Sequence, residues 1–154
     1  MDMAERFGQT SEAVRLKVGA LIVHETLGVI AEGVNGMPPD WPTEVCEERK
    51  YFDGGGWINF DESLYPYIDS DGEHYALVTK PECRHAEIAA LEKLWKKAET
   101  AEGAMMFVSH SPCVACAIKI KTAGIVKVYY RHAYRESSGI DFLKRNKIEV
   151  VKLN

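Results

Sequence analysis

The chain has 154 residues, of which 46% are hydrophobic and 27% charged, which is typical of one globular domain. Its formal net charge of -4 argues against a nucleic-acid-binding protein, which would carry an excess of positive charge. Because residues 1–7 lack the apolar core of a signal peptide, and no apolar run approaches the roughly 20 residues of a membrane span, we expect a cytoplasmic protein that binds neither nucleic acid nor membrane.

A helix and a hairpin are expected at the start of the chain. Weakly spaced apolar residues predict a helix over 2–16. Two β-branched runs, 18–23 and 27–34, predict buried strands. The short turn at 24–26 between them makes an antiparallel hairpin the expected pairing.

Residues 37–84 differ in composition from the rest of the chain. They hold eleven acidic residues against four basic ones, a net charge of -7, so the remainder carries +3. Five of the six prolines and a Gly run at 54–56 favour irregular structure, whereas eight of the fifteen aromatic residues argue against disorder. We interpret the segment as an ordered acidic insertion in a single domain that spans 1–154.

Helical and strand patterns alternate from residue 85 onward. Such alternation predicts a three-layer αβα architecture, with helices covering a mixed central sheet of about five strands. A helix between the last two strands makes them parallel, since a tight hairpin cannot make that connection. The expected helices are 85–99, 113–122 and 139–146, and the expected strands are 104–108, 125–130 and 148–153.

Two short motifs lie where two of these helices begin. His85-Ala86-Glu87 reads H-x-E, and Pro112-Cys113-Val114-Ala115-Cys116 reads P-C-x-x-C. One imidazole and two thiolates leave a fourth zinc position open, as in catalytic zinc sites. The combination is the signature of zinc-dependent base deaminases. We predict that His85, Cys113 and Cys116 bind zinc, because the starts of two adjacent helices can converge on one ion.

Glu87 has a different predicted role. Zinc lowers the pKa of a bound water to about 7, and a nearby carboxylate can take its proton, pass it to a ring nitrogen of the substrate and assist the release of ammonia. Glu87 is therefore the predicted catalytic acid and base. Two alternatives stay open, because H-x-E alone is a weak signal: a closed structural zinc site with a fourth protein ligand, or two unrelated halves of a motif.

With these residues in place, the chain resembles the deoxycytidylate (dCMP) deaminases of the zinc-dependent cytidine deaminase superfamily, and among them the phage-encoded enzymes. The resemblance covers most of the chain outside the insertion. Besides the two zinc motifs it rests on Lys17-Val18-Gly19-Ala20, on Gly33-Val34-Asn35-Gly36-Met37-Pro38, and on the stretch from Tyr129 to Val150.

The resemblance implies conversion of dCMP to dUMP with release of ammonia, which supplies thymidylate synthesis. It also implies a homohexamer that dCTP activates and dTTP inhibits, each with Mg2+, and the host cytoplasm as location if the chain is phage-encoded. Two departures bear on regulation: Ala89 stands where the family often has Asn, and Val34 replaces the aromatic residue of the effector loop. Asn35 and Gly36 belong to that loop.

Substrate contacts carry over from the family by position. Asn35 would hydrogen-bond the sugar, and the backbone N–H groups of Ala86 and Cys113 would contact the base. The carbonyl of Ser111 would accept from the leaving amine, and Tyr134 matches a tyrosine of the substrate pocket. Turn formation for Asn35 and surface packing for Tyr134 remain alternative explanations. Arg131, Arg135 and Lys121 are candidates for the phosphate, without a means to choose among them.

Some members of the family carry a second, structural zinc. One of its ligands is a cysteine near the first helix, where this chain has Ala13. Cys46, His74 and Cys83 lie at positions close to the other ligands, so our hypothesis is that they bind a second zinc, with a further ligand or water. The alternative is two reduced cysteines buried as small hydrophobic residues and a surface histidine.

Two other functions compete with a mononucleotide deaminase. A deaminase of cytosine or adenine within nucleic acid would need a positively charged channel, which the acidic insertion argues against. A non-catalytic zinc protein that binds nucleotides would have no need of a proton carrier such as Glu87.

Overall fold

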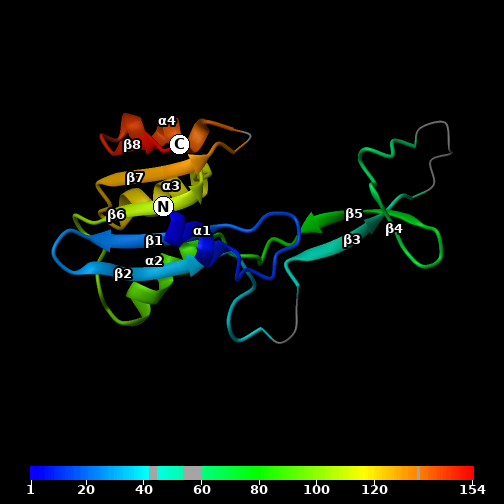
Figure 1. Ribbon diagram of the computed structural model, residues 1–154, viewed down its shortest axis with the longest axis horizontal. Helices are drawn as coiled ribbons and strands as arrows, with labels where there is room; N and C mark the ends of the chain where they lie inside the picture. The colour runs from blue at the N-terminus through cyan, green and yellow to red at the C-terminus, as the bar shows by residue number, and fades with distance from the viewer. Residues whose placement is uncertain (42–44, 54–59, 135) are drawn as a thin grey trace.

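A mixed five-stranded sheet forms the centre of the structure, a computed structural model that describes residues 1–41, 45–53, 60–134 and 136–154 (Figure 1). Its strand order is β2-β1-β6-β7-β8. Strand β1 is antiparallel to both of its neighbours, whereas β6, β7 and β8 are parallel. The predicted mixed sheet, the hairpin and the parallel last pair are thus confirmed. The strands are β1 Gly19–His24, β2 Gly28–Val34, β6 Met105–His110, β7 Lys127–His132 and β8 Glu149–Lys152.

Helices cover both faces of this sheet. A Cβ added to Gly19 would lie 1.9 Å from the carbonyl oxygen of Ala4 in α1, whereas one added to Gly33 would lie 2.2 Å from that of Ala86 in α2. Gly33 pairs with Ala20, and successive residues of β1 point to opposite faces, so α1 and α2 lie on opposite sides of the sheet. This confirms the three-layer prediction. The helices are α1 Asp2–Gly8, α2 Ala86–Lys96, α3 Val114–Thr122 and α4 Ser138–Arg145.

The remaining helices lie on the side of α2, and α3 contacts both α2 and α4. Helix α2 ends three residues before the predicted position, where Ala98 adopts a φ of 56° that a continuing helix does not allow. None of the helices in the described residues is long and apolar enough to cross a membrane.

The main hydrophobic core lies between the sheet and the α2–α3–α4 layer. Alternate residues of paired strands point to one face, so their side chains form a continuous apolar surface. Buried residues of the three helices cover it. The contributing side chains include Ala20 and Ile22 of β1, Met106 and Val108 of β6, Val128 of β7, Leu91 and Leu94 of α2, Ile120 of α3 and Leu143 of α4, all exposed by 1% or less.

Helix α1 is shorter than predicted. It ends at Gly8, and the helix expected over 2–16 is therefore wrong beyond that residue. The backbone N–H groups of Val14 and Arg15 donate to the carboxylate of Glu47, at 3.1–3.2 Å, and not to carbonyls of a continuing helix. The helix closes locally, where the N–H of Thr10 donates to the carbonyl of Phe7 and that of Ser11 to the carbonyl of Gly8, and the backbone that follows is held by a residue more than thirty positions away.

The insertion projects from the core as an arm (Figure 1), a name we use for residues 46–80. Its described part is an antiparallel sheet with strand order β3-β5-β4, made of β3 Glu47–Tyr51, β4 Tyr67–Ile68 and β5 His74–Thr79. The Gly run at 54–56 lies outside the described residues. Both ends of the arm meet at the core, where the N–H of Lys80 donates to the carbonyl of Cys46 at 2.8 Å.

Candidate functional site

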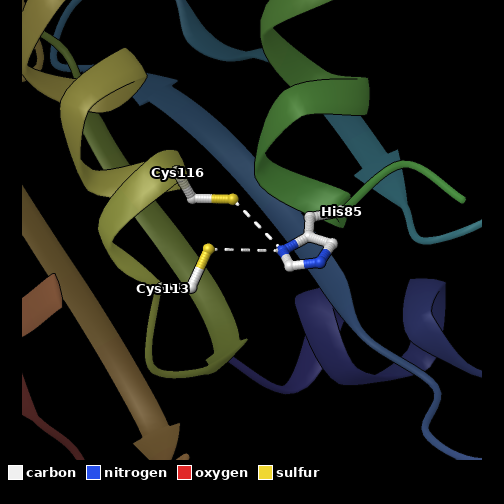
Figure 2. A group of neighbouring side chains, drawn as sticks. All are labelled: His85, Cys113 and Cys116. Atoms are coloured by element: carbon white, nitrogen blue, oxygen red, sulfur yellow. Dashed lines mark hydrogen bonds between the residues drawn. The ribbon is translucent and has the colours of Figure 1, made fainter. Parts of the chain in front are cut away.

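Three side chains with metal-binding atoms meet where α2 and α3 begin (Figure 2). His85 is the N-cap of α2, Cys113 is the N-cap of α3, and Cys116 lies in the first turn of α3. Their ligand atoms all lie within 4.8 Å of one another, and the Nδ1 atom of His85 is 3.6 Å from the Sγ of Cys113 and 3.3 Å from that of Cys116. The two helix starts therefore converge, as the sequence motifs predicted.

This donor set fits a zinc ion. Zinc prefers exactly such nitrogen and sulfur atoms, and ligands arranged tetrahedrally at about 2.0–2.3 Å from the ion lie roughly 3.5 Å apart. The observed separations agree with that spacing. Three protein ligands leave the fourth position open to a water or a substrate.

Hydrogen bonds within the cluster shift the pKa values of its three side chains. The hydrogen bond from Cys116 and a second one from His85 lower the pKa of Cys113 to about 3. The same bond to Cys113, together with burial, raises the pKa of Cys116. The hydrogen bond to Cys113 also raises the pKa of His85. A bound zinc ion would favour the thiolate form of both cysteines, because thiolates are the form that binds the metal.

Glu87 lies in the first turn of α2, two residues after His85, and its side chain is only 3% exposed. Burial raises the pKa of this carboxyl group, because a charged carboxylate loses its hydration there. A carboxyl group whose pKa is raised can both accept and donate a proton near neutral pH.

Glu87, His85 and Cys113 line a cavity of about 430 Å³. Pockets of this size are typical of small-molecule sites. The four residues predicted to contact a substrate, which are Asn35, Ala86, Ser111 and Tyr134, line it as well.

The backbone around the cavity is held by Asn35 and Ser111. The Oδ1 of Asn35 accepts from the N–H of Val18 and its Nδ2 donates to the carbonyl of Leu16, both at 2.7 Å, so this side chain also braces the neighbouring strand. The hydroxyl of Ser111 accepts from the N–H of Tyr134 at 2.7 Å.

Gly36 does not line the cavity. It pairs with Arg84 through two backbone hydrogen bonds of 3.1 and 2.9 Å. The predicted effector loop, Asn35 and Gly36, thus lies next to Arg84, the residue that precedes His85.

Two of the three cations proposed from the sequence for a phosphate, Arg131 and Lys121, do not line the cavity. Arg131 is paired with Asp2 and Glu5 of α1, and Lys121 lies exposed in the last turn of α3. The third candidate, Arg135, lies outside the described residues. A different cation, Arg15, lines the cavity. It lies two residues before the Lys17-Val18-Gly19-Ala20 piece, and no pattern in the sequence singled it out.

The second zinc site predicted from Cys46, His74 and Cys83 is not assembled. The two sulfurs are 2.6 Å apart and packed with Ala13. His74 is the first residue of β5, whereas Thr79, the last residue of that strand, is the one that pairs with Glu47, the neighbour of Cys46. Five residues of extended strand put roughly 17 Å between His74 and that end. The ring of His74 contacts the carbonyl of Tyr65 and the ring of Phe60 instead.

The two cysteines have the character of buried hydrophobic residues. Cys46 is 1% exposed and Cys83 is 9% exposed. Burial and the hydrogen bond with Cys46 raise the pKa of Cys83 to about 12, so this thiol stays protonated at neutral pH. Among the described residues, the group formed by His85, Cys113 and Cys116 is the one cluster of three or more ligand side chains suited to a metal.

Gly139 in α4 packs directly against the metal-binding loop. An added Cβ would lie 2.0 Å from the carbonyl oxygen of Pro112 and 2.8 Å from the carbonyl carbon of Cys113. We predict that Gly139→Ala lowers the free energy of unfolding by about 1–3 kcal/mol, the usual cost of overpacking. Urea unfolding followed by circular dichroism measures it.

Gly36→Ala is the matched control for that substitution, because no atom lies within 4 Å of a Cβ added there. Its unfolding midpoint should stay close to that of the unsubstituted chain. Equal midpoints for the two variants would contradict the packing argument.

Comparisons with known proteins agree with the geometry of the site. Residues 1–132 match the family described as the cytidine and deoxycytidylate deaminase zinc-binding region. Deoxycytidylate deaminase of Enterobacteria phage T4 is 28% identical over 95% of this chain and 83% of its own length. The Saccharomyces cerevisiae deoxycytidylate deaminase is 31% identical over 88% of this chain, and the matched region makes up 37% of the length of the yeast protein.

A solved structure is similar over nearly the whole chain. The dCMP deaminase of cyanophage S-TIM5, crystallised in complex with dCMP and dUMP, superposes with a TM-score of 0.76 and 36% sequence identity. The match covers 99% of this chain and 92% of the cyanophage chain. The arm is therefore included in a region for which a structural counterpart exists.

Proposed function

Because the chain belongs to the cytidine and deoxycytidylate deaminase family, we propose that it converts dCMP to dUMP and ammonia by hydrolysis. The observation that carries the proposal is the buried carboxyl group of Glu87 beside the His85, Cys113 and Cys116 cluster, in the lining of a cavity of nucleotide size. The similarity to a cyanophage enzyme that binds dCMP and dUMP supports the choice of substrate.

In this proposal His85, Cys113 and Cys116 hold the zinc ion. When bound, zinc supplies a hydroxide at neutral pH. Because His85 and Cys113 line the cavity, a zinc ion held by the three residues would lie beside the space in which the base would bind.

Glu87 would move the protons. Its carboxylate takes a proton from the attacking water and delivers it to the ring nitrogen next to the amine-bearing carbon. It then takes a second proton from the new hydroxyl group on that carbon and gives it to the amine, which leaves as ammonia. Burial suits this role, because bulk water would otherwise compete for the same protons. The carboxyl group ends the cycle in the state in which it began.

Backbone groups at the two helix starts would orient the base. The first N–H groups of a helix have no partner within the helix, and Ala86 and Cys113 stand at those positions of α2 and α3. We assign to them the contacts with the base, to the carbonyl of Ser111 the contact with the leaving amine, and to Asn35 the contact with the sugar. Tyr134 would close the open side of the cavity, where it is 49% exposed.

One assay tests this function. Purified protein is mixed separately with dCMP, CMP, deoxycytidine and single-stranded DNA, and deamination is followed by the loss of cytosine absorbance. We expect dCMP to react fastest. Equal turnover of deoxycytidine would reject recognition of the phosphate, turnover of DNA alone would favour a nucleic-acid deaminase, and no reaction with any substrate would favour a non-catalytic zinc protein.

We further propose that the enzyme is a homohexamer in the cytoplasm of the cell that expresses it, supplies thymidylate synthesis, and is activated by dCTP and inhibited by dTTP, each bound with Mg2+. The backbone pairing of Gly36 with Arg84 supports a link between the effector loop and the metal-binding motif. Adding each triphosphate to the same assay tests it: a rate unaffected by both would reject the regulation. For the oligomeric state, we expect analytical sedimentation to show a species with six times the mass of one chain.

A further inference from the structure

The loop between α1 and β1 is fixed by the base of the arm. Glu47, the first residue of β3, is 5% exposed, and its two carboxylate oxygens accept the N–H groups of Val14 and Arg15. A buried carboxylate needs such partners to offset its lost hydration. The negative charge of Glu47 is therefore directed at the backbone of this loop.

Thr79 holds the side chain of Arg15 from the same end of the arm. It pairs with Glu47 across the β3–β5 ladder, so the first residue of β3 and the last residue of β5 lie together at the end of the ladder where the arm joins the core. The Oγ1 of Thr79 accepts a hydrogen bond of 3.1 Å from the Nη1 of Arg15. One arginine is thus fixed at both its backbone and its guanidinium group.

Arg15, Glu47 and Thr79 line the same cavity as His85, Glu87 and Cys113. Among the described residues that line it, Arg15 is the one with a permanent positive charge. His110 also lines the cavity, but burial and the neighbouring His132 lower its pKa, so its ring is neutral at pH 7. The cavity is therefore lined by residues of the metal-binding and proton-transfer group and by one arginine.

A nucleoside monophosphate brings a phosphate dianion into the cavity with its base. Enclosing that charge without a cation would cost several kcal/mol, and a guanidinium binds phosphate oxygens through two parallel N–H groups. Other arginines near the site are already paired, Arg84 with Glu92 and Arg131 with two carboxylates of α1. We propose that Arg15 binds the phosphate of the substrate, and that Thr79 is a positioning residue that orients its guanidinium.

This inference rests on the proposed function and assigns the arm a part in it. Arg15→Ala should raise the KM for dCMP about 10- to 100-fold, the loss expected for one charge-assisted hydrogen-bonded pair, and should change kcat by no more than about threefold. Inorganic phosphate should inhibit the unsubstituted enzyme competitively and the variant at least tenfold more weakly. Lys121→Ala, which removes an exposed positive charge outside the cavity, is the control and should leave both constants unchanged.

A KM for Arg15→Ala within about twofold of the unsubstituted value, on a protein that deaminates dCMP, would overturn the inference and leave the proposed function standing. A protein that deaminates none of the tested substrates would instead overturn the proposed function. The two failures are therefore distinguishable.

The positioning role of Thr79 has its own test. Thr79→Val removes the hydroxyl at nearly constant volume, and Thr79→Ser keeps it. We expect the valine variant to raise the KM for dCMP about three- to tenfold at unchanged kcat, and the serine variant to restore it. Equal KM values for the two variants would reject the role of the hydroxyl, and a loss of kcat in both would indicate a structural effect only.

Discussion

Glu87→Gln is expected to lower kcat for dCMP by about 10³-fold, with the zinc content unchanged. The amide has nearly the shape of the carboxyl group, so it fits the same buried position, but it cannot accept and return a proton. General acid–base groups contribute roughly 10²- to 10⁴-fold, and Glu87 would serve in both transfers. Steady-state kinetics together with metal analysis of the purified variant measures the effect.

Glu99→Gln is the matched control, since it makes the same chemical change at an exposed residue just after α2. It should keep the full rate. If Glu87→Gln turned over dCMP at a comparable rate with its zinc in place, Glu87 could not be the proton carrier, and another group in the cavity would have to be sought.

Cys116→Ser is expected to abolish both zinc binding and deamination. It replaces one of the two sulfur ligands by a hydroxyl, which is neutral at pH 7 and a poor zinc ligand. A ligand that binds only the folded chain stabilises it by about 4 kcal/mol at a thousand times its Kd, so the variant should also melt at a lower temperature. A chelator should lower the Tm of the unsubstituted protein and have no effect on that of the variant.

Cys46→Ser separates this loss from a general effect of removing a buried cysteine. Cys46 is as buried as Cys116 but lies in the cluster with Ala13 and Cys83. We expect this variant to keep one zinc per chain and the full rate, and the unsubstituted protein to contain one zinc per chain. Two zinc ions per chain, one of them lost in Cys46→Ser, would contradict the separation of His74 from the two cysteines.

The catalytic cluster was predictable because its residues lie close to helix starts. His85 and the pair Cys113 and Cys116 each follow an extended segment and open a helix, and such starts come together when the helices pack on one face of a sheet. The alternation of helices and strands after residue 85 was readable for the same reason, since each element has its own periodic pattern.

Features that depend on the arm were not predictable. Glu47 holds the backbone that follows α1 from a distant part of the chain, and the composition of the insertion did not indicate that its ends meet at the core. His74 was grouped with Cys46 and Cys83 from their positions along the chain, whereas the ladder of β3 and β5 places it at the other end of a strand. Arg15 was overlooked because its importance depends on Thr79, sixty-four positions away.

Because the two ends of the arm meet at the core, the arm can differ in length without separating the residues at its ends. Lys80 and Cys46 are already joined by a hydrogen bond, so the segment between them behaves as a closed loop anchored at its neck. The entropy of closing a flexible loop grows only slowly, by about 0.6 kcal/mol for each doubling of its length. A change in the length of the arm therefore alters the closure entropy little, whereas a change at its two ends would disturb Glu47 and Thr79, which line the cavity. The arm is thus a natural attachment point for an additional module, separated by its own length from the chemistry at the core.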